Sequence, residues 1–210
     1  MKTLAKTLFA SALTLIVLAT SAFSSSATEN SINPAASIDF NKVIVTGNAR
    51  VVLIQSDKPH VMMPENYNKE NTTIVQKADK LYITSTEKDM IDIVVYVKDL
   101  QRIDACQKAI VNTRGKFTSK VLQVFLKDKA SAYVNGNIAS LYTSVKDNSS
   151  LRLKGTSKDH TLTKGNVAKL KMDQFAALKT TVTTADGEVL ATDYSIQIPR
   201  DTVLADNKTK

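Results

Sequence analysis

Residues 122–136 read LQVFLKDKASAYVNG, and residues 141–155 read LYTSVKDNSSLRLKG. The two segments align without gaps at an offset of 19 residues, which places the Lys-Asp pair at 127–128 over the same pair at 146–147. Each segment contains a short β-rich run, a polar turn, a second β-rich run and a closing glycine. A repeat of about 20 residues with two short strands is typical of a β-solenoid, because one coil cannot bury its apolar face until a neighbour stacks on it.

The repeat continues in weaker form on both sides of this pair. Residues 103–115 form a looser upstream copy, and residues 162–172 and 178–192 form two downstream copies. We therefore predict an all-β fold, a right-handed β-helix or solenoid-like stack of short strands with coils of about 20 residues. A β-sandwich with irregular strand spacing is the alternative. The residues expected to point inward are Val124, Leu126, Val134, Val145, Leu151, Leu153 and Leu170.

The chain before the repeat also consists of β-rich runs. Residues 43–45 and 51–54 flank Gly47-Asn48, a dipeptide suited to a tight turn. Residues 91–97, IDIVVYV, show the period-two alternation that a strand requires. No segment after the first 27 residues carries a convincing helical stripe of ten or more residues, which argues against a helical domain.

The first 27 residues have the three parts of a secretory signal peptide. Lys2 and Lys6 provide the positive start, residues 8–19 the apolar run, and a small-residue segment ends at Ala27. This run is shorter than the roughly 20 apolar residues that a membrane-spanning helix needs. We predict a cleaved signal peptide, export to the periplasm, outer cell surface or medium, and no transmembrane segment in the mature chain. The predicted divisions are a signal peptide at 1–27, a polar linker at 28–39, the β domain at 40–199 and a polar C-terminal tail at 200–210.

The composition limits the chemistry that the chain can perform. The 210 residues carry a formal net charge of +8, one cysteine and two histidines. Cys106 cannot form an internal disulfide, and it lies in an apparent strand, so we expect its thiol to be buried. His60 and His160 have no other typical metal ligand beside them in the sequence, so no metal site is predicted. We also predict no catalytic residues, no cofactor-binding residues and no cofactor, since no nucleophile-elbow motif is present.

Positive charge is concentrated in residues 146–179, which contain eight basic and three acidic residues. Residues two apart on a strand share a face. Arg152 and Lys154 are therefore expected on one outer face, and Lys169 and Lys171 on the corresponding face of the next coil. Stacking would align these four residues into a basic binding face suited to an acidic polysaccharide or another polyanion. The alternative is a solvated outer face that prevents edge pairing.

Asp128 and Asp147 occupy equivalent positions of the two aligned repeats. Neighbouring strands lie about 4.8 Å apart, and carboxylates about 5 Å apart are the arrangement of a retaining glycosidase. A carbohydrate-active enzyme on a β-helix is therefore one alternative function. Each aspartate follows a lysine within the repeated turn, which favours a solvated turn over a catalytic pair.

Three features of the chain are similar to the head GIN domain family of autotransporter-adhesin-like proteins. Residues 40–55 resemble the opening strand pair of that family. LYIT at 81–84 and IDIVVYV at 91–97 follow in the family's order, and LQRI at 100–103 leads into the coils, which are the third feature. The charged turns of the coils depart from the Ser-Gly-Ala-Ser-like turn that the family often carries.

The resemblance implies a right-handed β-helix-like fold and an exported location. Together with the charge pattern, it predicts a non-enzymatic, adhesin-like protein of the cell envelope or surface. The expected partner is an acidic polymer, such as an acidic polysaccharide, or a surface protein. An envelope accessory protein without a ligand is the remaining alternative.

Overall fold

The structure is a computed structural model that describes residues 40–65, 67–165, 167–184 and 189–193. The predicted signal peptide (1–27), linker (28–39) and C-terminal tail (200–210) lie outside the described residues, as do residues 194–199 of the predicted β domain. In the described part of the chain every regular element is a strand, which confirms the all-β prediction. None of these residues forms a helix that is long and apolar enough to cross a membrane.

The described residues contain 13 strands in sequence. The first eight are β1 (Lys42–Gly47), β2 (Ala49–Gln55), β3 (His60–Met62), β4 (Thr72–Lys77), β5 (Lys80–Ser85), β6 (Ile91–Val97), β7 (Arg102–Cys106) and β8 (Ile110–Arg114). The other five are β9 (Phe117–Leu126), β10 (Ser131–Val145), β11 (Ser150–Lys164), β12 (Lys169–Thr183) and β13 (Val189–Asp193). The 15-residue strands β10, β11 and β12 each continue through a bend.

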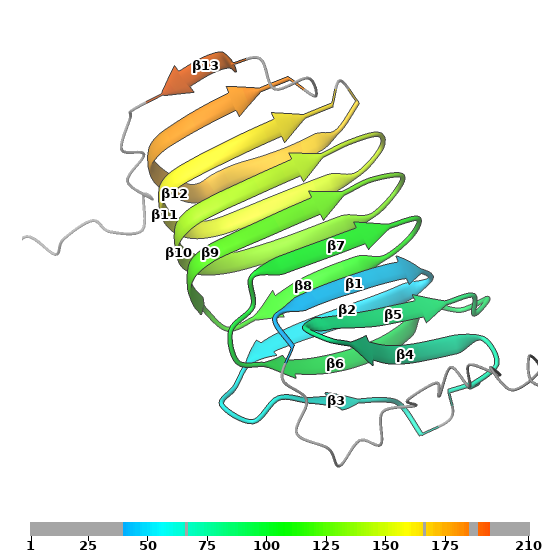
Figure 1. Ribbon diagram of the computed structural model, residues 1–210. Helices are drawn as coiled ribbons and strands as arrows, with labels where there is room; N and C mark the ends of the chain where they lie inside the picture. Colours follow the sequence, from blue (N-terminus) through cyan, green and yellow to red (C-terminus); the bar gives the residue numbers. More distant parts are fainter. Residues whose placement is uncertain (1–39, 66, 166, 185–188, 194–210) are drawn as a thin grey trace, which may run out of the picture. The chain divides into compact units, whose positions relative to one another are not determined.

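The sequence repeat is the spacing between register partners in neighbouring strands. Ser131 of β10 pairs in parallel with Ser150 of β11, and Leu122 of β9 pairs with Leu141 of β10, so the offset is 19 residues in both cases. Between β7 and β9 the offset is 21 residues. Parallel pairing at a nearly constant offset stacks each pass of the chain on the one before (Figure 1). The right-handed sense of the coils stays a prediction.

Three antiparallel pairs occur at the ends of the described sheet, namely β3–β6, β4–β5 and β12–β13. All other pairs among the described strands are parallel. Parallel strands need a crossover connection rather than a hairpin. Here the return run on the opposite side of the coil provides that connection.

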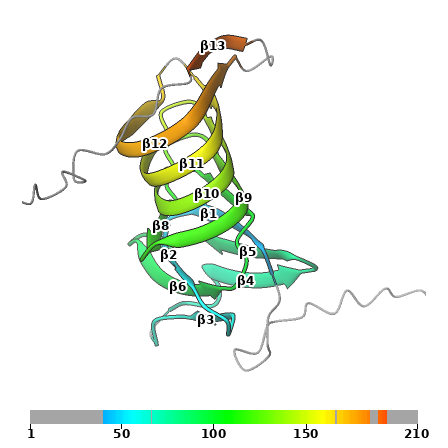
Figure 2. The ribbon, with the colours of Figure 1, turned by 90° about the vertical axis from the view of Figure 1, so that its left-hand side faces the viewer.

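The strands form one sheet that turns back on itself to make two layers (Figure 1, Figure 2). β10 links the layers, because its first residues pair with β8 and its residues from Gly136 onward pair with β9. We call layer A the face formed by β6, β2, β8 and the first parts of β10 to β12. Layer B consists of β5, β1, β7, β9 and the last parts of β10 to β12.

The core lies between the two layers and is built from alternate residues of each strand. In β6, Ile91, Ile93, Val95 and Val97 are buried, and the residues between them face outward. Of the residues predicted to point inward, only Leu170 is not fully buried, and it still packs against the core. Removing these apolar side chains from water is the main contribution that stabilises the stack.

The glycine that closes the 141–155 repeat lies where two coils come very close together. Gly155 has a φ of +107°, and a Cβ atom there would lie 2.0 Å from the backbone oxygen of Gly136. Glycine is the residue that tolerates both this conformation and this approach. Backbone packing therefore explains why the repeat ends in glycine.

Candidate binding surfaces

The four predicted basic residues lie on the outer face of layer A, in β11 and β12, and we call them the basic face. Arg152 and Lys171 are direct register partners, and both side chains are exposed. Lys169 is also exposed, at the start of β12. Lys154 is half-buried and pairs with Gln174, because the register shifts after Arg152. The structure thus brings Arg152 and Lys171 together and places the other two beside them.

Two neighbours modify the electrostatics of the basic face. Lys171 Nζ lies 3.9 Å from Asp173 Oδ2, so one carboxylate offsets part of the positive charge. The guanidinium carbon of Arg152 lies 5.6 Å from the ring centroid of Tyr133, its register partner in β10. An aromatic ring attracts a cation at this distance. The basic face therefore combines two adjacent cations with one aromatic ring.

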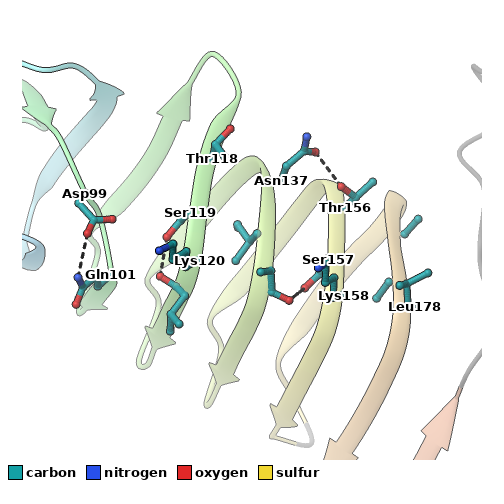
Figure 3. Close-up of a pocket in the computed structure, with 15 residues that line it drawn as sticks. Asp99, Gln101, Thr118, Ser119, Lys120, Asn137, Thr156, Ser157, Lys158 and Leu178 are labelled. Carbon is teal, nitrogen blue, oxygen red and sulfur yellow. Dashed lines mark hydrogen bonds between the residues drawn. The ribbon is translucent and has the colours of Figure 1, made fainter.

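A groove of about 1180 Å³ crosses the coils at the bend between the layers, and we call it the bend groove (Figure 3). Lys120 of β9 and Lys158 of β11 line it, together with the exposed apolar side chains of Val121 and Leu178. The sequence analysis missed this groove, because its residues become neighbours only through the register of four strands. Its polar lining includes Thr118, Asn137 and Thr156, and the Thr156 hydroxyl donates a hydrogen bond of 2.8 Å to Asn137 Oδ1.

Asp128 and Asp147 lie in the turns at one edge of the stack, where their carboxylates contact backbone groups. Asp128 Oδ2 accepts a hydrogen bond from the backbone N–H of Gln107 at 2.9 Å, and Asp147 Oδ2 accepts one from the N–H of Asp128 at 3.0 Å. The two aspartates have φ values of 60° and 54°, in the left-handed region that aspartate tolerates. These contacts favour a turn role over a catalytic pair.

The two histidines lie in different environments. His60, in β3, stacks on Tyr96 with ring centroids 4.0 Å apart. His160 is buried in the core, where its Nε2 lies 2.9 Å from Thr143 Oγ1, and burial lowers its pKa to about 4. Within the described residues no group of three or more histidine, cysteine, aspartate or glutamate side chains is arranged to hold a metal ion. His160 is therefore a neutral core residue at neutral pH.

The prediction that Cys106 is buried is wrong. Its side chain is half-exposed on the outer face of layer B, and its Sγ lies 3.2 Å from Oγ1 of Thr46. The reason is the period of two in β7, where Ile103 and Ala105 face the core, so that Cys106 faces outward. Counting the alternation from Ile103 is the sequence signal that identifies this orientation.

The fold and these surfaces define an all-β protein of stacked parallel coils that carries charged and polar side chains on its outer faces. The chain belongs to the family described as "Putative auto-transporter adhesin, head GIN domain", whose model matches residues 39–193. This match confirms the resemblance that the opening strands and the coils suggested.

Solved structures with a similar fold come from Bacteroides and Parabacteroides. A "putative adhesin" from Bacteroides fragilis NCTC 9343 is 16% identical with a TM-score of 0.60, and the match covers 70% of this chain and 72% of that chain. A "putative lipid binding protein" from Parabacteroides distasonis ATCC 8503 is 14% identical with a TM-score of 0.54, over 70% of this chain and 74% of that chain. A "putative adhesin" from the same strain is 16% identical with a TM-score of 0.54, over the same shares of the two chains. At these identities the likeness establishes the fold alone. The curated proteins include no match to the chain.

Proposed function

We propose that this protein is exported to the cell envelope or surface and acts as a non-enzymatic, adhesin-like protein that binds an acidic polymer through the basic face. The predicted signal peptide at residues 1–27 supports export. The family description and the names of two structural neighbours support adhesion. The observation that carries the proposal is the direct register of Arg152 with Lys171, which sets two cations side by side on adjacent coils.

The spacing of these cations suits a chain of repeated negative charges. Neighbouring strands lie about 4.8 Å apart, so Arg152 and Lys171 can meet successive anionic groups of one polymer. Lys169 and Lys154 lie on either side of that pair along the strands and extend the positive field. Attraction of this kind is screened by salt and includes counterion release, so binding should weaken as ionic strength rises.

Retention on heparin-agarose tests the basic face. Changing all four of its residues to glutamate should abolish retention at low salt, whereas the unchanged protein should elute only as salt increases. The matched control changes four exposed lysines outside the basic face, which lowers the net charge equally. Those control residues are Lys58, Lys69, Lys77 and Lys88. Unchanged retention of the first variant, or an equal loss in both variants, would contradict the proposal.

The bend groove favours a second candidate function, the binding of an anionic amphiphile such as a fatty acid. Val121 and Leu178 are 46% and 51% exposed and lie in the same groove as Lys120 and Lys158. One structural neighbour is named a lipid binding protein, which supports this candidate. Calorimetric titration with dodecanoate tests it. Binding should be lost in Leu178→Asp and kept in a control, Val189→Asp, whose side chain is 58% exposed outside the groove.

The non-enzymatic part of the proposal is supported by the use of Asp128 and Asp147 to hold turns. A glycan-release screen tests this part directly. Release of sugars by the unchanged protein that disappears in Asp147→Asn would contradict it, because that substitution keeps the turn but removes the carboxylate.

A further inference from the structure

The outer face of layer B contains a cavity of about 520 Å³ that lies on β1, β7, β9, β10 and β11, and we call it the layer B cavity. Its volume is within the range of about 300–1,000 Å³ that small-molecule sites occupy. The cavity lies in the opposite layer from the basic face, so the two surfaces are separate. The side chains that give it chemical character are Arg102, Asp104, Phe125, Lys127, Tyr142 and Lys146.

Aromatic rings form one wall of the cavity. The ring centroids of Phe125 and Tyr142 lie 5.4 Å apart at an interplanar angle of 42°. The guanidinium carbon of Arg102 lies 4.2 Å from the centroid of the Phe125 ring. The Tyr142 hydroxyl lies 3.3 Å from the hydroxyl of Thr163. These contacts hold both rings in place, so they form a preorganised apolar surface beside polar groups.

The charge of Arg102 is already balanced inside the cavity wall. Its Nε and Nη2 donate hydrogen bonds to the two oxygens of Asp104, at 2.7 Å and 3.2 Å. This bidentate pair keeps the guanidinium over the Phe125 ring and leaves Asp104 as a fixed acceptor at the cavity. Arg102 and Asp104 thus contribute shape and hydrogen-bonding groups and no net charge.

Two lysines supply the net positive charge of the cavity. Lys127 and Lys146 follow Leu126 and Val145, which are register partners at the ends of β9 and β10. Both lysines are exposed, and neither takes part in an ion pair among the described residues. They therefore extend from equivalent positions of adjacent coils, about one strand spacing apart.

We propose that the layer B cavity binds a hexuronic acid unit of a glycan. The apolar face of the sugar ring would pack on Phe125 and Tyr142, its carboxylate would lie between the ammonium groups of Lys127 and Lys146, and a ring hydroxyl would donate to Asp104. A neutral sugar leaves both ammonium groups without a counterion, and an inorganic anion leaves the aromatic wall exposed. An acidic sugar is the ligand class that uses the aromatic, acidic and cationic groups together.

Cys106 gives this proposal a site-specific reporter. It is the only cysteine in the chain, it lines the cavity, and it is half-exposed. A small alkylating reagent should therefore modify this one position. A sugar bound beside Phe125 should block access to the thiol, which makes the alkylation rate a measure of occupancy at the layer B cavity.

The experiment measures alkylation of Cys106 by iodoacetamide, followed by intact-mass spectrometry, with digalacturonate as the probe. At a digalacturonate concentration ten times its dissociation constant we expect alkylation to slow by about tenfold. The dimethyl ester of digalacturonate, which keeps the sugar rings but lacks the charges, should give little protection. No protection by digalacturonate at any concentration, or equal protection by the ester, would overturn the proposal.

Variants separate the cavity from the basic face. The pair Lys127→Gln and Lys146→Gln should raise the digalacturonate concentration needed for half-protection by about tenfold. The matched pair Lys154→Gln and Lys169→Gln, in layer A, should leave it unchanged. Equal alkylation rates of all these variants without sugar show that Cys106 and its surroundings are intact. Protection that is unaffected by the first pair, or reduced equally by both, would rule the cavity out.

The aromatic wall is tested with a graded pair of substitutions. Tyr142→Phe keeps the ring and should retain protection, whereas Tyr142→Ala removes the ring and should weaken it. Full protection in Tyr142→Ala would contradict a stacking role. Heparin retention of these variants is a separate readout of the basic face, so failure of one proposal does not decide the other.

Discussion

The carboxylate of Asp147 accepts a hydrogen bond from the backbone N–H of Asp128, with Oδ2 3.0 Å from the nitrogen. Asp128 makes the same contact to Gln107, one coil earlier, at 2.9 Å. All three residues occupy the left-handed region, with φ values of 61° for Gln107, 60° for Asp128 and 54° for Asp147. One turn residue therefore sets the local conformation and also joins its coil to the coil before it.

This contact predicts that Asp147 contributes to stability in two separable ways. Asp147→Ala loses the acceptor and puts a Cβ without a polar group in the left-handed region, so the free energy of unfolding should fall by about 1–2 kcal/mol. Asp147→Gly keeps the conformation and loses only the acceptor, so a loss of about 1 kcal/mol is expected. Asp147→Asn keeps both features and should be nearly neutral. Urea unfolding measures the three values, and a loss for Asn as large as that for Ala would disprove this account.

His160 predicts a pH-dependent loss of stability. Burial lowers its pKa to about 4 from its ordinary value of 6.5, so the unfolded chain binds a proton at a higher pH than the folded chain does. Stability should therefore be full above pH 6.5 and fall as the pH decreases towards 4, by about 3 kcal/mol if His160 acts alone.

Unfolding measured by urea between pH 7 and 4 tests the His160 prediction. His160 pairs with Leu141 in the neighbouring strand, so His160→Leu extends a leucine position of the repeat. This variant should lose most of the pH dependence in that interval, because the titrating group is gone. An unchanged slope would assign the pH dependence to other groups.

Gly155 predicts a severe packing effect at one corner of the coil. A Cβ at Gly155 would lie 2.0 Å from the backbone oxygen of Gly136, at a φ of +107°. Gly155→Ala should therefore lower the free energy of unfolding by about 3 kcal/mol or more. Gly115 also has a positive φ, of +78°, but no atom lies within 4 Å of the Cβ position. Gly115→Ala should cost only about 1 kcal/mol. Similar losses for the two variants would rule out the close approach as the cause.

The ion pair of Lys42 and Asp79 predicts a shifted titration at the start of layer B. Lys42 Nζ donates a hydrogen bond of 2.6 Å to Asp79 Oδ2, and this contact lowers the pKa of the Asp79 carboxyl below its ordinary value. In Lys42→Met the pKa of Asp79 should return upward, whereas Lys42→Arg retains a donor and should keep it low. Nuclear magnetic resonance titration of the Asp79 carboxyl carbon measures this directly. A pKa that does not move in Lys42→Met would show that the ion pair is not formed in solution.

The sequence predicted several parts of the fold at the level of single residues. The alignment of Leu122 with Leu141 is the register that the strands adopt. It was predictable because stacked coils place equivalent residues side by side, so the same turn and the same apolar positions recur. The burial of Cys106 was predicted wrongly, because its residue type was weighed above its position in the alternation of β7.

The candidate surfaces were only partly predictable. Arg152 and Lys171 could be placed together because each lies two residues after the equivalent start of its strand. The half-burial of Lys154 and its pairing with Gln174 depend on a register shift in β12, for which the sequence carries no separate signal.

The sequence by itself determined the all-β class, the coil length and the identity of most core residues. Those properties follow from a period-two alternation and from a repeat whose apolar face must be covered by its neighbours. Only the tertiary structure decided that Arg102, Phe125 and Tyr142 surround one cavity. The offset is 21 residues from β7 to β9 and 19 from β9 to β10, and strand pairing selects those values. Side chains on three coils thus become neighbours through backbone hydrogen bonds, which no local sequence pattern records.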